Sequence, residues 1–236
     1  MKPTPVLLSG NMCDARLWTE AVRATFPGAI DADLTRDDSI EAMAERALAA
    51  TDGQLLPVGF SMGAIVAVEM AVQAPERIVG LVLSGYNATA DLPERAAHRP
   101  AQQSEVRAGG LERVLVEELK PNYLAAQNRK DNSLLRLLRD MGMDLGADVF
   151  VRQSEALRLR GDRRDAIAAL HMPVLYLCGE EDTLCPPAWH QIWANLTPKS
   201  QFKEISGAGH MLPLEAPKAF VATIENWLTI NEKEFA

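Results

Sequence analysis

The chain has 236 residues, of which 47% are hydrophobic and 24% charged, so it is long enough for one domain with a sizeable core. Its formal net charge of −8 disfavours nucleic-acid binding, which selects for clustered Lys and Arg. No apolar run reaches membrane-spanning length, and the run behind Met1 is too short for a signal peptide. We therefore expect a cytoplasmic protein without nucleic-acid or membrane partners.

Short apolar runs alternate with amphipathic helical patterns along the chain. Strands are expected at residues 6–8, 29–32, 55–60, 78–84, 173–178 and 202–205. The runs show little polar alternation, which is typical of parallel strands covered on both faces. This order predicts an α/β fold with a doubly wound, mainly parallel sheet, in which ligands bind beyond the carboxyl ends of the strands.

Residues 86–166 interrupt this alternation. They contain several short amphipathic helical patterns, ending at Pro121, near Gly142 and at Gly161. The segment carries 14 basic and 13 acidic residues, whereas the rest of the chain is strongly acidic. We predict a single domain over residues 1–236 with residues 86–166 as an inserted helical cap.

The stretch Gly59-Phe60-Ser61-Met62-Gly63 joins an apolar run of strand length to one of helix length. A strand that turns directly into a helix places its apex residue, Ser61, at positive φ. The flanking glycines are needed because a Cβ at either position would collide with the strand or helix backbone. The pattern predicts a nucleophile elbow that presents the Ser61 hydroxyl above the sheet. The alternative is a buried loop serine between two packing glycines.

A serine hydroxyl needs a base to accept its proton. His210 lies in the glycine-rich loop Ser206-Gly207-Ala208-Gly209-His210, directly after the last expected strand, and is the candidate base. The other histidines have different interpretations: His98 on the surface of the insertion, His171 at the wrong end of a strand, and His190 exposed on a helix.

An acid must orient that base, and the loop from Gly179 to Pro186 offers three. Asp182 is the candidate, because its short side chain reaches inward from the end of the preceding strand while Glu180 and Glu181 stay in solvent. The loop after Ser84 contains no acid until Asp91, which argues against the other common position.

These pieces together resemble the α/β-hydrolase fold enzymes of the small esterase, lactonase and carbon-carbon hydrolase type. The matching stretches are Leu8-Ser9-Gly10-Asn11, the elbow, Ala74-Pro75-Glu76-Arg77, Gly179 to Pro186, Gly207-Ala208-Gly209-His210 and Leu214-Glu215-Ala216-Pro217. The chain has Ser9-Gly10 where relatives often have His-Gly. It also begins at what resembles the family's third strand, which implies a six-stranded sheet without an antiparallel edge.

The resemblance implies that Ser61 is the nucleophile, His210 the base and Asp182 the residue that orients it. It also implies an oxyanion hole formed by the backbone N–H groups of Asn11 and Met62. No metal or cofactor is implied. The three cysteines (Cys13, Cys178 and Cys185) lack metal-ligand spacing and are expected to be reduced and buried.

The expected pocket residues are mainly apolar: Met12, Trp18, Phe60, Leu184 and Met211. They favour a small ester, thioester or lactone with an apolar acyl part. Two alternatives remain open: the same triad used for carbon-carbon bond hydrolysis or perhydrolysis, and a non-catalytic module that binds a small ligand. The sequence carries no signal for the oligomeric state.

Overall fold

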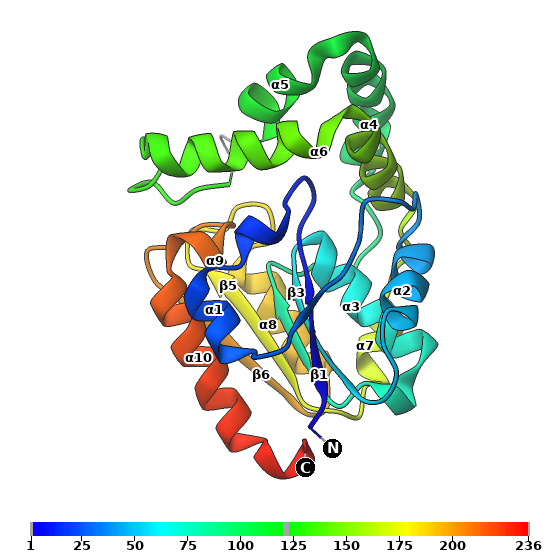
Figure 1. Cartoon of the computed structure of the whole chain (residues 1–236), viewed down its shortest axis with the longest axis vertical. Helices are drawn as coiled ribbons and strands as arrows, with labels where there is room; N and C mark the ends of the chain where they lie inside the picture. The colour runs from blue at the N-terminus through cyan, green and yellow to red at the C-terminus, as the bar shows by residue number, and fades with distance from the viewer. Residues whose placement is uncertain (1, 120–122, 236) are drawn as a thin grey trace.

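The computed structural model describes residues 2–119 and 123–235, and its centre is a six-stranded parallel sheet (Figure 1). The strand order is β2-β1-β3-β4-β5-β6, and every neighbouring pair is parallel. The strands are β1 (Thr4–Leu8), β2 (Ile30–Asp31), β3 (Leu55–Phe60), β4 (Leu81–Ser84), β5 (Val174–Gly179) and β6 (Ser200–Ile205). The predicted doubly wound α/β sheet is confirmed.

Burial explains which runs became strands. Every residue of β3, β4 and β5 is buried, as their continuous apolar sequences predicted. The two edge strands are more exposed, and the last begins two residues earlier than the pattern indicated. The expected strand at residues 29–32 shortens to Ile30–Asp31, which pairs only with Val6 and Leu7 of β1.

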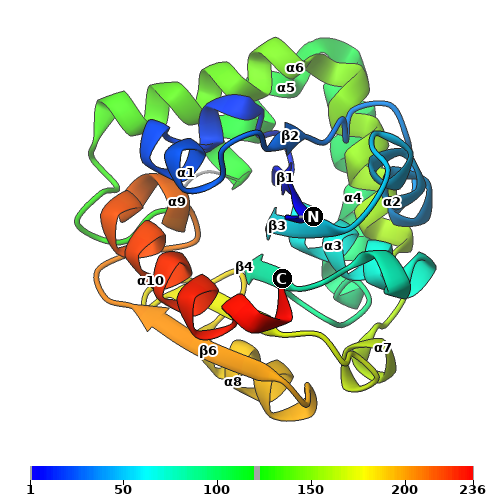
Figure 2. The ribbon, with the colours of Figure 1, turned by 60° about the horizontal axis from the view of Figure 1, so that its bottom comes forward.

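Helices cover both faces of the sheet and build two cores. On one face, α1 (Glu20–Thr25) packs against α10 (Pro217–Ile230). On the other face lie α2 (Ile40–Ala49), α3 (Met62–Gln73), α7 (Arg164–Ala168) and α8 (Pro187–Leu196), as Figures 1 and 2 show. The remaining short helices of this part are η1 (Ala15–Leu17), η2 (Pro75–Arg77), α9 (Leu212–Glu215) and η6 (Glu232–Glu234).

The segment between β4 and β5 contains the inserted helices, which lie above the carboxyl ends of the strands in Figure 1. They are α4 (Pro93–Glu105), η3 (Val106–Gly110), α5 (Leu111–Arg113), η4 (Val114–Leu119) and α6 (Asn132–Leu159). The prediction of a helix ending near Gly142 was wrong, because α6 continues through it and is interrupted only at Gly146, where φ is 83°. Gly142 instead packs against the Leu115 side chain. The expected helix end at Pro121 lies outside the described residues.

A buried ion pair closes the base of this insertion. Asp91 lies where the chain enters the insertion, and Arg160 lies where the chain leaves it. The Arg160 Nη1 to Asp91 Oδ1 distance is 2.9 Å. The Arg160 Nε also donates to the carbonyl of Thr89, and the amide of Arg163 donates to the carbonyl of Ala88. The segment that enters the insertion after β4 and the segment that leaves it towards β5 are thus bonded to each other.

Within residues 2–119 and 123–235, no helix combines the length and hydropathy that crossing a membrane requires.

Candidate active site

Ser61 occupies the sharp turn between β3 and α3. Its φ of 53° and ψ of −115° lie outside the usual regions for a residue with a side chain. Its amide donates to the carbonyl of Ser84 on β4 (2.8 Å), which fixes the turn to the sheet. The flanking glycines are required by close approach: a Cβ on Gly59 would lie 2.5 Å from Ala64 Cα, and one on Gly63 would lie 1.9 Å from Leu8 O.

The structure joins Ser61, His210 and Asp182 in one hydrogen-bonded chain, although these residues are far apart in the sequence. The Ser61 Oγ to His210 Nε2 distance is 3.0 Å, and the His210 Nδ1 to Asp182 Oδ2 distance is 2.8 Å. A carboxylate can only accept, so Nδ1–H donates to Asp182 and Nε2 is free to accept from the serine hydroxyl.

The second carboxylate oxygen of Asp182 also accepts hydrogen bonds. Oδ1 accepts from the amides of Leu184 (2.9 Å) and Cys185 (2.8 Å). Burial of the carboxyl by itself raises its pKa, but the interactions with His210 and the Cys185 amide outweigh burial and hold the pKa below its ordinary value. Asp182 is therefore ionised at neutral pH and fixed in orientation.

Contacts from several segments hold the loop that carries His210. The His210 amide donates to the carbonyl of Tyr123 (2.8 Å), and the imidazole packs against the Phe60 ring with centroids 5.1 Å apart. Glu215 accepts from the amides of Gly209 and Ala125, so a single carboxylate links this loop to the insertion. The imidazole is thereby held in place over Ser61.

The amides of Asn11 and Met62 come from the two elements that converge at Ser61. Both residues line the same cavity as Ser61 and His210. The contact of Gly63 with the carbonyls of Leu8 and Ser9 sets the first turn of α3 directly against the end of β1.

A side chain from the insertion holds the turn after β1. Gln153 of α6, which is 1% exposed, accepts through Oε1 from the Met12 amide (2.9 Å) and from Asn11 Nδ2 (3.1 Å). Its Nε2 donates to the carbonyl of Leu34 (3.0 Å). Met12 has a φ of 53°, a conformation unusual for its side chain, and Gln153 stabilises it there.

The cavity above Ser61 has a volume of about 270 Å³, which suits a small ligand. Of the five pocket residues expected from the sequence, Leu184 lines it. The other four are buried outside its lining: Trp18, Phe60 and Met211 in the core under α1 and α10, and Met12 against the insertion. Nearness to the motifs along the sequence did not indicate which way these side chains point.

Polar residues of the insertion form much of the cavity wall. They are Asp91, Arg95, His98, Arg99, Gln102, Glu118 and Arg160. A larger hollow of about 770 Å³ opens elsewhere on the insertion, between η4 and α6, and none of Ser61, Asp182 and His210 lines it.

Comparison with known proteins agrees with the fold. Residues 6–223 match the model of the alpha/beta hydrolase family. The chain belongs to this family. Together with the relatives below, this makes it an enzyme of the hydrolase class.

Two curated relatives and one solved structure illustrate the similarity. The biotin biosynthesis bifunctional protein BioHC of Cellvibrio japonicus is 26% identical over 96% of this chain, which spans 47% of that protein. The pimeloyl-[acyl-carrier protein] methyl ester esterase of Klebsiella pneumoniae is 31% identical over 77% of the chain and 72% of that enzyme. A thermophilic esterase from Thermogutta terrifontis, solved with malate bound, superposes with a TM-score of 0.86 at 27% identity, covering 100% of this chain and 92% of that one.

Sequence reasoning missed two buried residues near the site of this alpha/beta hydrolase. Gln153 lies in a helix whose pattern gave no sign of a contact with the turn after β1. His190 was expected to be exposed, but it is fully buried, and its Nε2 accepts from the amide of Tyr86 (2.9 Å). The paired prolines before His190 could have indicated a helix start packed against the sheet.

Proposed function

We propose that this hydrolase cleaves small carboxylic esters, thioesters or lactones with Ser61 as nucleophile, His210 as general base and Asp182 as the residue that orients it. The observation that supports this most strongly is the chain of two hydrogen bonds, 3.0 Å and 2.8 Å, that runs from the serine hydroxyl through the imidazole to a buried carboxylate.

The proposed reaction begins when the Ser61 Oγ attacks the substrate carbonyl carbon and its proton passes to the His210 Nε2. The carbonyl electron pair moves to oxygen, where the amides of Asn11 and Met62 stabilise the negative charge. Collapse of this intermediate expels the alcohol or thiol, which takes the proton from the imidazole. Water then attacks the acyl-enzyme by the same steps and releases the acid.

Asp182 stabilises the imidazolium formed in each half of the reaction. Because both of its oxygens are hydrogen-bonded and its pKa lies below the ordinary value, it stays ionised throughout. We also propose that the insertion between β4 and β5 acts as a cap, since residues of α4 line the cavity above Ser61.

The test combines covalent labelling with a substrate panel. A fluorophosphonate should label the protein at Ser61, and esters, thioesters and lactones of graded acyl length should be hydrolysed. Ser61→Ala should lose both the label and the activity. Ser206→Ala is the matched control, because Ser206 is exposed in the His210 loop and its substitution should change neither.

Three results would contradict the proposal. Hydrolysis that persists in Ser61→Ala would exclude the nucleophile. A diketone cleaved far faster than any ester would favour carbon-carbon bond hydrolysis. A ligand that raises the melting temperature without turnover would favour a binding module.

A further inference from the structure

The wall of the cavity that Ser61 lines carries more positive than negative charge. Three guanidinium groups line it, those of Arg95, Arg99 and Arg160, against the two carboxylates of Asp91 and Glu118. Sites that bind only an apolar group are lined mainly by apolar side chains, so charged groups in this wall favour a substrate that carries a polar or charged group.

Asp91 forms ion pairs with two of these arginines. Its carboxylate, whose side chain is 1% exposed, lies 2.6 Å from the Arg99 Nε and 2.9 Å from the Arg160 Nη1. One carboxylate thus neutralises one of two guanidinium groups held in the wall. The pair of arginines keeps a net positive charge at this end of the cavity.

Glu118 also has partners for its carboxylate oxygens. Its Oε2 accepts from Gln102 Nε2 at 2.7 Å, and its Oε1 lies 2.7 Å from the Arg113 Nη2. Both carboxylates of the wall therefore have partners other than Arg95.

Arg95 has no such partner. Its side chain is exposed and forms no hydrogen bond or ion pair with residues 2–119 and 123–235, although it lines the same cavity as Ser61. It lies one helical turn before Arg99 on α4, so the two side chains leave the helix on the same face. A guanidinium presents paired donors that match the two oxygens of a carboxylate.

We propose that Arg95, supported by the positive charge at Arg99, binds a free carboxylate of the substrate, so that the preferred substrate is an ester or lactone whose acid part carries a second, unesterified carboxylate. This inference rests on the proposed function, because the bond that is cleaved is the one at Ser61. It replaces the expectation of a wholly apolar acyl part with a short acyl chain that ends in an anion.

The test compares three methyl esters of similar length that differ in their terminal charge. They are monomethyl glutarate, which is anionic, methyl glutaramate, which is neutral, and methyl δ-aminovalerate, which is cationic. Hydrolysis is followed as acid release at constant ionic strength. The wild-type enzyme should cleave the anionic ester with a kcat/KM at least about tenfold above the neutral one, and the cationic ester should be the poorest.

Substitution at position 95 separates binding of the anion from general damage. Arg95→Gln should lower kcat/KM for monomethyl glutarate about ten- to a hundredfold and change that for methyl glutaramate less than threefold. Arg95→Glu should reverse the order of the anionic and cationic esters. Arg107→Gln is the matched control, because Arg107 is an exposed arginine of the same insertion that does not line the cavity.

Two outcomes would overturn the inference: a wild-type enzyme that cleaves the neutral ester as well as the anionic one, and an Arg95→Gln variant that loses activity equally on both. In either case hydrolysis of the neutral ester that depends on Ser61 leaves the proposed function standing. If instead none of the esters is hydrolysed and no label attaches to Ser61, the proposed function itself fails. Inhibition by inorganic phosphate as strong as by glutarate would also overturn the assignment of a carboxylate site.

Discussion

The sheet and the insertion contribute to the cavity in different ways. Ser61, Asp182 and His210 all follow strands of the sheet, and backbone hydrogen bonds or buried packing fix each of them. The insertion contributes charged side chains on α4, several of them half-exposed or exposed. Under the proposed function the sheet thus provides the reacting groups, and under the further inference the insertion selects the substrate. A change in the sheet should therefore affect all substrates, and a change in the wall only some.

The largest expected effect lies in the sheet. Asp182→Asn keeps an oxygen that can accept from the Leu184 and Cys185 amides, but its NH₂ faces the His210 Nδ1 and favours the wrong imidazole tautomer. We expect kcat to fall about 10⁴-fold on every ester, with the fold unchanged. Steady-state kinetics on the three methyl esters measures this. Glu180→Gln in the same loop is the control and should keep its kcat. If Asp182→Asn lost activity only on the anionic ester, the division between sheet and wall would be contradicted.

The base of the insertion tests whether the two regions fold as one unit. Asp91→Ala leaves the buried Arg160 without its counter-ion, so we expect the free energy of unfolding to fall by about 3 to 5 kcal/mol. Asp31→Ala, which removes the exposed pair with Arg23, should cost less than about 1 kcal/mol. Urea denaturation measures both values.

Two spectroscopic probes can distinguish unfolding of the sheet from unfolding of the insertion in this experiment. All four tryptophans lie outside residues 86–166, so their fluorescence reports the sheet, whereas far-ultraviolet circular dichroism also reports the inserted helices. Coincident transitions in the wild-type protein are expected for a single domain. Transitions that separate would show that the insertion is a domain of its own.

The contact between α6 and the turn after β1 joins the two regions close to Ser61. Gln153→Ala removes the acceptor of the Met12 amide and frees the turn that carries Asn11. Because the oxyanion forms only in the transition state, we expect kcat to fall about ten- to a hundredfold while KM stays within about twofold. Activity on all three methyl esters should fall in parallel.

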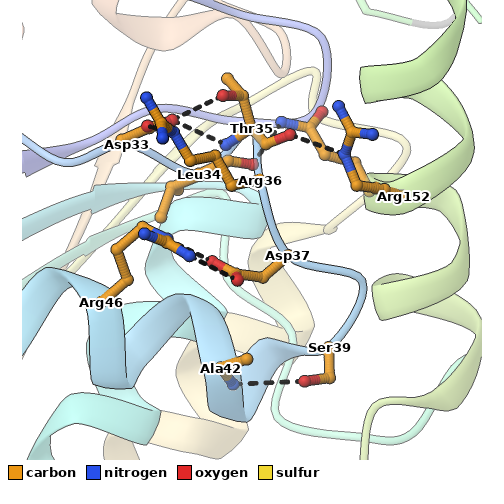
Figure 3. A network of polar contacts seen from close by, with 10 residues as sticks. Asp33, Leu34, Thr35, Arg36, Asp37, Ser39, Ala42, Arg46 and Arg152 are labelled. Carbon is orange, nitrogen blue, oxygen red and sulfur yellow. Dashed lines mark hydrogen bonds and ion pairs between the residues drawn. The ribbon is translucent and has the colours of Figure 1, made fainter.

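The neighbouring residue provides the control. Arg152 of α6 donates its Nε to the carbonyl of Thr35 (2.8 Å), beside the Leu34 carbonyl that Gln153 contacts, as Figure 3 shows for Arg152 and Thr35. No hydrogen bond joins it to the Asn11 turn among the described residues, so Arg152→Ala should leave kcat within about twofold. A raised KM with unchanged kcat in Gln153→Ala would indicate a role in substrate binding instead.

The difference between the sheet and the insertion also explains which features could be predicted from the sequence. The strands of the sheet, the turn at Ser61 and the loop that carries His210 follow from local patterns, because a strand, a tight turn and a helix are specified by neighbouring residues. The apolar pocket did not follow, since Trp18 and Met211 turn into the core instead. Gln153 lies 141 residues from Met12, and a contact at that distance depends on how α6 docks, which a helical pattern does not specify.

The smallest expected effect concerns a buried histidine of the sheet region. Burial lowers the pKa of His190 to about 4, and its Nε2 accepts from the amide of Tyr86, at the start of the chain that leads into the insertion. The unfolded chain takes up this proton near pH 6.5, so the stability is complete above that pH and decreases as the pH falls towards 4. This group alone should remove about 2 kcal/mol of the free energy of unfolding between pH 7 and pH 5.

In His190→Gln, whose amide oxygen can accept from Tyr86 without titrating, that part of the pH dependence should disappear from urea denaturation curves. His171→Gln, at an exposed position, should retain the wild-type slope. Asp182 stays ionised across this window, because its interactions with His210 hold its pKa below the ordinary value of a carboxyl. An unchanged slope in His190→Gln would contradict the assignment, because it would show that another group causes the pH dependence in this window.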